Sequence, residues 1–388
     1  MSLGTVPPSF NRAWAEIDLN ALLWNFSKIR ESISADCSVM AIVKANAYGH
    51  GAFMTARTLL EAGASCLGVA RADEGAGLRK QGISAPIIVL TGVDYQEIDS
   101  VFQYNLIPAL SRPDELKSLN QAAASAHRKL KVHLKLETGM NRLGIPEEER
   151  PDFFKALKRA PSLEVDGLFS HLSQTGPDGE TENQRQRERF EFALKQFHDL
   201  TGINPAGSPW VHLANSSGIV MNRNYHFDLV RPGIMLYGLP PFYGCPVPLK
   251  PVLSWKAKII QTRTVPPGSD IGYEQGYKTR RTTRVGVLPV GYADGYSRQL
   301  SNRAEVMVGG RLAPVIGNVC MDMTMIDLTD LPGSVDVGTA ATLVGKEPGI
   351  SAGRLAELSD TISYEIVSRI GPRIPRIFIR DGQVVSYE

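Results

Sequence analysis

One segment, Ala41-Ile42-Val43-Lys44-Ala45-Asn46-Ala47-Tyr48-Gly49-His50-Gly51, places a lysine directly after an apolar run typical of buried parallel strands. Such a lysine passes from a dry strand into an open loop, where a lowered amine pKa can make it a nucleophile or a Schiff-base partner. A single lysine proves little, because a solvated loop lysine is about as common. The rest of the chain therefore has to show whether the same layout is repeated.

The layout recurs throughout the first 230 residues. Stretches with helical periodicity alternate with most of the apolar runs, and they lie at 52–62, 72–80, 113–124, 147–159 and 181–200. This β-then-α rhythm predicts a (β/α)8 barrel of the TIM type. A doubly wound open sheet is the rival, but it normally carries a glycine-rich phosphate loop after its first strand, which residues 44–48 are not. The eight predicted strands are 39–43, 67–70, 87–90, 106–110, 130–136, 163–169, 210–213 and 227–230.

The rhythm changes after Pro240-Pro241-Phe242-Tyr243-Gly244 to β-branched runs broken by proline and glycine. At 388 residues the chain exceeds one ordinary core, so two domains are expected. We predict a barrel domain over 11–245 and a C-terminal mainly-β domain over 246–388. The predicted elements of the second domain are strands at 257–265, 284–290, 305–308, 323–328, 376–380 and 383–386, with a helix at 352–359.

The amino-acid composition limits the kinds of ligand or partner that the protein is expected to bind. The 42 basic and 40 acidic residues give a net charge of +2, which favours a small-molecule ligand over nucleic acid or an anionic membrane. Residues 1–10 do not resemble a signal peptide, and no apolar run reaches the roughly 18 residues that span a bilayer, so a cytoplasmic protein is expected. The four cysteines form no CxxC pair and the seven histidines no HExxH motif, which predicts reduced thiols and no metal site.

The residues that follow the predicted barrel strands form a coherent set, because active sites of such barrels lie at the C-terminal ends of the strands. Lysine, arginine, hydroxyl and amide groups suit an anionic cofactor, and pyridoxal phosphate fits them, since a lysine holds its aldehyde while the protein cradles its phosphate. Ser216 begins a predicted short helix, and Gly233 and Ile234 offer backbone N–H groups to the phosphate. The set comprises Lys44, Tyr48, Lys135, Arg142, His171, Asn215, Ser216, Ser217, Arg231, Gly233 and Ile234.

These motifs give the chain an end-to-end resemblance to the alanine racemases, which are fold-type III pyridoxal phosphate enzymes. Residues 41–51 are similar to the family's cofactor-lysine segment, which implies that Lys44 holds the cofactor and Tyr48 lies near the phosphate. Thr138-Gly139-Met140-Asn141-Arg142-Leu143-Gly144 resembles the segment whose arginine contacts the cofactor's phenolic oxygen and the substrate carboxylate. Residues 231–238 resemble the segment whose arginine, here Arg231, faces the pyridine nitrogen, and His171 matches the histidine beside it.

The second domain carries the other half of the resemblance. Tyr273 falls where the family places its second catalytic base, and Tyr292 and Met321 lie in segments that shape the substrate entrance and bind carboxylate. In the family these groups reach the partner subunit's cofactor, which implies a head-to-tail homodimer. Tyr364 matches a tyrosine near the phosphate of its own subunit.

Two residues, Glu274 and Glu137, depart from the family pattern. Glu274 follows Tyr273 where the family usually has a small residue, so its carboxylate either raises the pKa of the tyrosine or faces solvent. Glu137 stands where aspartate is commoner. Lys135 matches a lysine that is carbamylated in some members.

The resemblance implies interconversion of L- and D-alanine, with D-alanine supplied for peptidoglycan. Racemisation needs a base on each face of the substrate, and Lys44 and Tyr273 are expected to serve the D- and L-enantiomers respectively. A cationic Arg231 beside the pyridine nitrogen disfavours its protonation. The alternatives are a racemase of broader specificity, for example toward serine, a fold-type III decarboxylase, or a non-catalytic pyridoxal phosphate-binding protein. Taken singly, each of these residues would be an ordinary packing, capping or salt-bridge residue.

Overall fold

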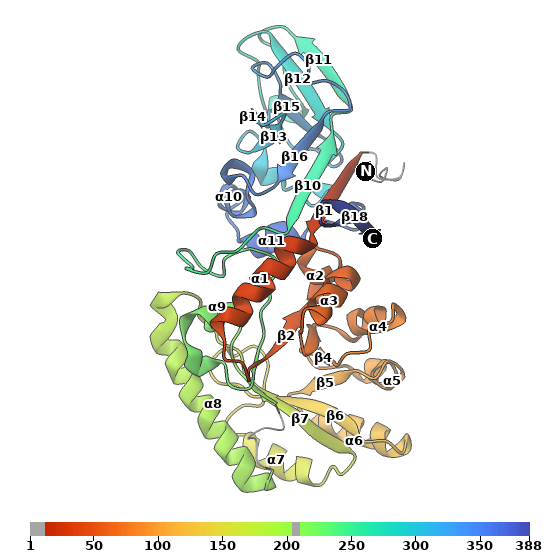
Figure 1. The fold of residues 1–388 in the computed structure, drawn as a ribbon, viewed down its shortest axis with the longest axis vertical. Coiled ribbons are helices and arrows are strands. Elements are labelled where there is room, and N and C mark those ends of the chain that lie inside the picture. Colours follow the sequence, from red (N-terminus) through yellow and green to blue (C-terminus); the bar gives the residue numbers. More distant parts are fainter. Residues whose placement is uncertain (1–11, 204–209) are drawn as a thin grey trace.

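The computed structural model describes residues 12–203 and 210–388, so the predicted start of the barrel domain at residue 11 lies outside the described residues. The molecule is elongated, with a helix-covered barrel at one end and a β-rich part at the other (Figure 1). Within the described residues, no helix is long and apolar enough to cross a membrane.

Eight parallel strands form the barrel, in the order β8-β7-β6-β5-β4-β3-β2-β9. The edge strands β8 and β9 approach each other, since the amide of Asp228 donates to the carbonyl of Val211 and the amide of Arg231 to that of Ala214, both at 3.0 Å. The sheet is therefore nearly closed, and the predicted barrel is confirmed. The strands are β2 Ser38–Ile42, β3 Cys66–Val69, β4 Ile87–Val89, β5 Ile107–Leu110, β6 Leu130–Lys135, β7 Leu163–Phe169, β8 Trp210–His212 and β9 Leu229–Val230.

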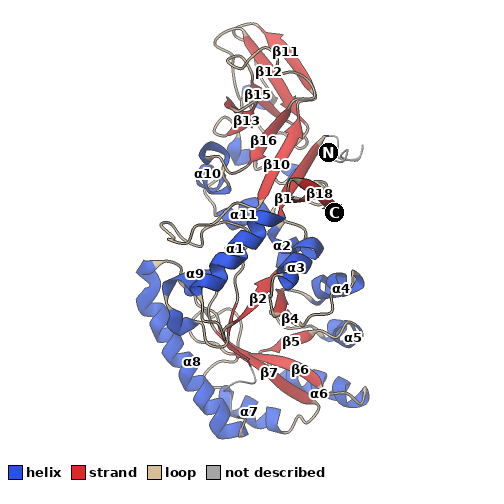
Figure 2. Ribbon diagram, viewed as in Figure 1, coloured by secondary structure: helices blue, strands red, loops and turns tan. Residues whose placement is uncertain are grey.

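Helices surround the barrel strands, as Figure 2 shows in blue around red. Side chains along β2 point alternately to the two faces of the barrel sheet. Val39 and Ala41 belong to the main hydrophobic core, whereas Met40 and Ile42 belong to a smaller cluster with residues of β3, β4, β5 and β9. The barrel helices are α1 Leu19–Ser32, α2 Lys44–Tyr48, α3 Ala52–Glu61, α4 Ala72–Lys80, α5 Ile98–Gln103, α6 Pro113–Ser125, α7 Arg150–Lys158, α8 Glu180–Thr201 and α9 Ser216–Met221.

The β-rich part contains a seven-stranded sheet in the order β14-β13-β16-β10-β1-β17-β18 and a three-stranded sheet β11-β12-β15. The single strand predicted over 257–265 is in fact the end of β10 and the whole of β11, which lie in different sheets. Its later elements are β10 Leu253–Lys258, β11 Gln261–Val265, β12 Thr283–Leu288, β13 Glu305–Val308, β14 Arg311–Pro314, β15 Thr324–Asp327, β16 Ala340–Val344, α10 Ala352–Leu358, α11 Ser363–Ser368, β17 Arg376–Arg380 and β18 Gln383–Tyr387.

The first strand, β1 Ala13–Asp18, joins the C-terminal sheet, where it pairs antiparallel with β10 and parallel with β17. Its residues lie within the segment that the sequence assigned to the barrel domain. The chain thus contributes a strand to the β-rich part before it enters the barrel, a pairing with partners about 240 and 360 residues away that local patterns do not encode. The limits 11–245 and 246–388 otherwise stay predictions.

The two parts are joined by the guanidinium of Arg376 on β17, which is buried. It donates to the carbonyl of Gly49 at 2.9 Å, just after α2, and to three carbonyls of residues 370–374. A buried, multiply bonded arginine holds its partners in one arrangement. The loop after Lys44 is therefore positioned by both parts of the molecule.

Candidate active site

Lys44 opens an unusual turn at the end of β2. The next four residues, Ala45 to Tyr48, all have φ between 51° and 53°, which is the left-handed region. Each L-residue in such a turn costs roughly 1–2 kcal/mol, so the turn has to be held by its surroundings. The amide of Ala45 donates to Glu74 at 2.6 Å and the side chain of Asn46 accepts from the amide of Ala52 at 2.7 Å. A strained segment therefore carries the lysine that the sequence singled out.

Four cationic side chains gather around the C-terminal ends of the barrel strands, which we call the barrel mouth. They are Lys44, Lys135, Arg142 and Arg231. Burial, followed by repulsion from Arg142, lowers the pKa of Lys44. The same causes, with Arg231 and Lys44 contributing, lower the pKa of Lys135 to about 8. Since Arg142 acts on both lysines and Arg231 on Lys135, these side chains face a common space, and that space suits an anion.

The Arg231 guanidinium is buried without a carboxylate among its hydrogen-bond partners in the described residues. It donates to the carbonyls of Ser170 at 2.7 Å and Leu213 at 2.9 Å, and to ring nitrogens of His212 at 2.8 Å and His171 at 3.3 Å. Burial lowers its pKa to about 9, which still leaves it protonated at neutral pH. Arg231 thus presents a fixed positive charge at the mouth.

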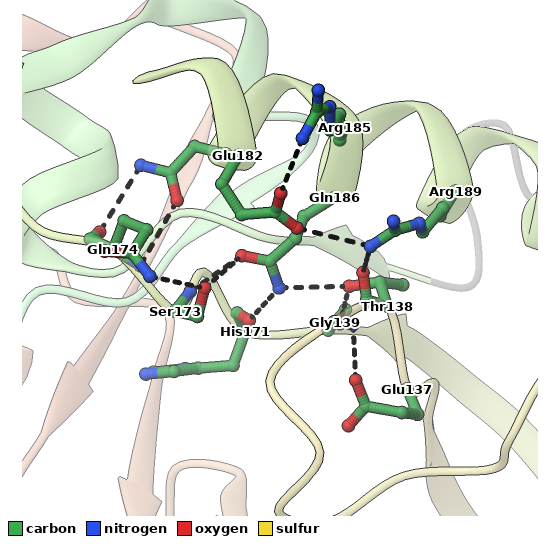
Figure 3. A network of polar contacts seen from close by, with 12 residues as sticks. Glu137, Thr138, Gly139, His171, Ser173, Gln174, Glu182, Arg185, Gln186 and Arg189 are labelled. Carbon is green, nitrogen blue, oxygen red and sulfur yellow. Dashed lines mark hydrogen bonds and ion pairs between the residues drawn. The ribbon is translucent and has the colours of Figure 1, made fainter. Parts of the chain in front are cut away.

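Helix α8 supports His171, Ser173 and Thr138 through the side chains of Gln186 and Arg189 (Figure 3). The amide of Gln186 donates to the carbonyl of His171 at 3.0 Å, and its oxygen accepts from the amide of Ser173 at 2.8 Å. Arg189 donates to the carbonyl of Thr138 at 3.1 Å. One helix therefore fixes both the end of β7 and the loop that leads to Arg142. Burial and then Arg231 hold the pKa of His171 well below its usual value, so its ring is neutral.

A second cluster at the mouth has the composition of a phosphate cradle. The amide of Gly233 donates to the hydroxyl of Ser216 at 2.9 Å, and a Cβ at Gly233 would lie 2.6 Å from the Tyr48 hydroxyl. Glycine is therefore required there for close approach. The rings of Tyr48 and Tyr364 lie 6.2 Å apart. Asn215 caps α9 by accepting from Gly218, and Ile234 follows Gly233 in a buried turn.

These two clusters fit pyridoxal phosphate. A lysine with a lowered pKa suits an aldehyde, the Tyr48, Ser216 and Gly233 groups suit a phosphate, and the space that a Cβ at Gly233 would fill admits it. The structure thus brings together the barrel residues that the sequence predicted.

Of the four predicted residues of the second domain, Tyr364 lies beside Tyr48 at the mouth, whereas the other three lie elsewhere. Tyr273, Tyr292 and Met321 line a hollow of about 710 Å³ whose lining residues all fall between Gly272 and Met325. Their exposed fractions are 72%, 44% and 54%, high for apolar or aromatic side chains. We call this surface the β-domain hollow. The predicted site is therefore divided into two parts, and the lining of the hollow includes no barrel residue.

The residues that distinguish this chain have clear places. Glu274 lies in the hollow with its carboxylate 2.9 Å from Arg298, and both side chains are exposed. Of the two readings of Glu274, the structure favours the one in which it faces solvent. The Glu137 carboxylate accepts from the amide of Gly139 and so shapes the loop before Arg142.

Comparison with known proteins agrees with this geometry. Residues 17–241 match the family described as alanine racemase, N-terminal domain, and residues 252–378 match alanine racemase, C-terminal domain. The chain belongs to the alanine racemase family. The resemblance seen in the sequence is thereby confirmed.

Relatives in the alanine racemase family cover almost the whole chain. The alanine racemase of Halothermothrix orenii is 42% identical over 367 residues, which are 94% of this chain and 96% of that protein. The alanine racemase of Symbiobacterium thermophilum is 43% identical over 370 residues, with the same coverage.

Solved structures of alanine racemases have the same fold over almost the whole chain. An alanine racemase from Bacillus anthracis with bound L-Ala-P superposes with a TM-score of 0.90 at 34% identity, covering 98% of each chain. That from Bartonella henselae with covalently bound pyridoxal phosphate gives 0.85 at 31% identity, covering 95% of this chain and 99% of its own.

Sequence reasoning missed several residues that support the site of this family member. The hydroxyl of Tyr237 donates to the carbonyl of Ile42 at 2.7 Å, and its ring lies 4.9 Å from that of Tyr48. His133 and His212 are fully buried on the inner side of β6 and β8. The only signal for the histidines was a polar residue inside an apolar strand run, which is more often a core histidine than a functional one.

Proposed function

We propose that this protein is a pyridoxal phosphate-dependent alanine racemase that interconverts L- and D-alanine. The observation that carries the proposal is the union of Lys44, the other mouth cations and the Tyr48–Ser216–Gly233 cradle on one face of a barrel whose family is shown. Composition alone excludes few functions, whereas this set of groups suits one cofactor.

The cofactor would be held by residues from five strand ends and by Tyr364 from α11. Lys44 would bind the aldehyde, and Tyr48, Ser216, Gly233, Ile234 and Tyr364 the phosphate, while Asn215 caps the helix that presents Ser216. Arg142 would contact the phenolic oxygen, and Arg231, with His171 beside it, the ring nitrogen. When bound, the cofactor supplies an electron sink that acidifies the Cα proton of the substrate.

Arg231 tunes that sink. Its guanidinium stays protonated at neutral pH and cannot accept a proton from the ring nitrogen, so the nitrogen remains a hydrogen-bond acceptor. A weaker sink limits side reactions of the acidified substrate. Four fixed hydrogen bonds hold the guanidinium in place for this role.

Two bases would move the Cα proton. The lowered pKa of Lys44 increases the fraction of neutral amine, which is the form that removes a proton from the D-enantiomer. The Tyr273 hydroxyl would act on the opposite face toward the L-enantiomer, and Tyr292 and the backbone of Met321 would shape the entrance and bind the carboxylate. Arg142 would share the carboxylate from the barrel side.

A head-to-tail homodimer would complete the site. Tyr273, Tyr292 and Met321 are exposed in the β-domain hollow, apart from the barrel mouth. Exposed aromatic and apolar side chains in a concave surface are typical of an interface. In a symmetric pair, each hollow would cover the partner's barrel mouth.

The proposed role is the supply of D-alanine for peptidoglycan by a cytoplasmic enzyme with no membrane or nucleic-acid partner. All four cysteines are free thiols, as is usual in a reducing compartment. A broader amino-acid racemase, for example one that also accepts serine, is the nearest alternative, because a pocket distinguishes small side chains by only about 1–3 kcal/mol. A decarboxylase and a non-catalytic carrier are tested by the same experiment.

The test is incubation of the cofactor-loaded protein with L-alanine in heavy water, followed by NMR with a chiral shift reagent. Deuterated D-alanine is expected. Exchange without inversion would contradict the two-base assignment, and no exchange would overturn the racemase proposal. Lys44→Ala, loaded in the same way, is the control that must abolish exchange. Parallel tubes with L-serine and an assay for carbon dioxide separate the alternatives.

A further inference from the structure

A line of buried polar groups leads from Arg231 away from the barrel mouth through the barrel interior. Arg231 donates to Nδ1 of His212 at 2.8 Å, and Nε2 of His212 lies 3.0 Å from Nδ1 of His133. Beyond it, Nε2 of His133 lies 3.8 Å from the carboxylate of Asp166. We call this line, Arg231–His212–His133–Asp166, the relay. None of its last three members has a part in the proposed proton transfers.

The arginine end of the relay fixes the protons along it. An arginine only donates, so Nδ1 of His212 must accept and its proton must sit on Nε2. That proton is donated to Nδ1 of His133, which places the second proton on Nε2 of His133, facing the carboxylate. Burial lowers the pKa of both histidines, so both rings are neutral. Both hydrogen bonds of the relay therefore point from the arginine toward the acid, and the last contact, between His133 and Asp166 at 3.8 Å, is one of charge rather than a hydrogen bond.

Local backbone geometry makes room for the relay. The register of β6 with β7 shifts at this point, since Val132 pairs with Val165 and His133 with Gly167, which leaves Asp166 as an extra residue. Such a bulge re-aims a side chain, and here it turns Asp166 toward His133. A Cβ on Gly167 would lie 2.5 Å from the His133 ring. The ring of Phe169 stacks on His212 with centroids 4.8 Å apart.

The acid end of the relay opens to solvent at the opposite end of the barrel. Asp166 retains 16% of its side-chain exposure, pairs with Lys131 at 2.7 Å, and lines a cavity of about 590 Å³ with Trp210. Its contacts with His133 and Lys131 lower its pKa, so the carboxylate is ionised. The relay thus ends on a negative charge, whereas Arg231 has no carboxylate of its own among the described residues.

We propose that Asp166 and His133 are positioning residues that act on Arg231 through His212, carrying the negative potential of the carboxylate to the guanidinium and fixing its orientation. The inference rests on the proposed contact between Arg231 and the ring nitrogen. A guanidinium whose positive charge is partly balanced in this way keeps one position, and its hydrogen bond to the ring nitrogen has a constant strength. Loss of the acid removes the charge that faces the His133 proton, so both histidine rings, and through them the guanidinium, are held less tightly.

The test compares three variants of the full chain. Asp166→Asn keeps a hydrogen-bond acceptor without the charge, and Asp166→Leu removes both. Glu164→Gln is the matched control, because Glu164 lies on the same strand and lines the same cavity but is exposed and outside the relay. Each protein is labelled with 15N-histidine and studied by NMR with and without cofactor, and His133→Asn assigns the relay signals.

We expect low-field imidazole N–H signals for His133 and His212, shifted in Asp166→Asn, lost in Asp166→Leu and unchanged in Glu164→Gln. With cofactor loaded, kcat for L-alanine should fall roughly tenfold in Asp166→Leu while KM changes less than about twofold. Relay signals that stay unchanged in both Asp166 variants would overturn the inference. Altered signals with unchanged kcat and cofactor absorbance would overturn the positioning role. The NMR arm needs no turnover, so a failure of the racemase proposal is seen separately.

Discussion

At the scale of single residues, charge decides what the barrel mouth can bind. Lys44, Lys135, Arg142 and Arg231 approach one another without an equal number of carboxylates, and burial, followed by repulsion between these cations, lowers the pKa values of the two lysines. An arrangement that is unfavourable in the free protein becomes favourable when an anion enters. Binding and catalysis therefore share one electrostatic cause.

Lys135 allows the free-energy cost of these buried, mutually repelling cations to be measured. Its folded-state pKa of about 8 lies below the ordinary lysine value of 10.5, so the unfolded chain binds the proton more tightly and stability rises as pH rises through 8 toward 10.5. We expect Lys135→Met to raise the free energy of unfolding of the cofactor-free protein at pH 7 by on the order of 2 kcal/mol. The gain should shrink by pH 9.5. Urea unfolding at several pH values measures it.

Lys129→Met is the control for this prediction, since Lys129 is an exposed lysine just before the same strand. It should change stability little at any of these pH values. A Lys135→Met gain that does not depend on pH would show that packing, rather than charge, separates the two proteins.

Tyr273 tests the second base. Tyr273→Phe removes one hydroxyl from an exposed side chain, so folding and cofactor content should be unaffected while kcat for L-alanine falls about 10²–10⁴-fold. Tyr95→Phe, on another exposed tyrosine, is the matched control and should keep full activity. Near-normal racemisation in Tyr273→Phe would remove this residue from the mechanism.

At the scale of elements, the left-handed turn after β2 is the part of the site that local sequence preferences disfavour. Only glycine adopts this conformation without cost, yet residues 45–48 are alanine, asparagine, alanine and tyrosine. The sequence correctly marked Lys44 as the end of a strand. It gave no sign of the turn, because the turn is held by Glu74, Ala52 and the buried Arg376 rather than by its own residues.

A glycine substitution measures the strain. Ala45 is exposed, with φ of 51°, so Ala45→Gly should stabilise the protein by about 0.5–1 kcal/mol despite the greater freedom of the unfolded chain. Ala124→Gly, in the last turn of α6, should destabilise it by up to about 1 kcal/mol. Thermal unfolding measures the stability of both variants. If both substitutions stabilised the protein, or both destabilised it, the turn would not be strained.

At the scale of the whole molecule, the site is divided between the barrel mouth and the β-domain hollow. If two copies complete each other, chains that lack different halves should complement. A mixture of Lys44→Ala and Tyr273→Phe, unfolded and refolded together, should form mixed dimers with one intact site each and recover about one quarter of the unsubstituted activity. Either variant alone should stay inactive. No recovery would indicate that Lys44 and Tyr273 act within one chain, or not together at all.

By itself the sequence determined the eight barrel strands, most of the helices between them and the order of the polar and charged residues at the strand ends, because hydrophobic periodicity and strand termini are local. It also determined the family. The tertiary structure alone decided that Ala13–Asp18 pairs with β10 and β17, that a bulge turns Asp166 toward His133, and that residues 45–48 turn left-handed. Each of these depends on partners distant in the chain, whose contacts outweigh local preference only once the whole fold has formed.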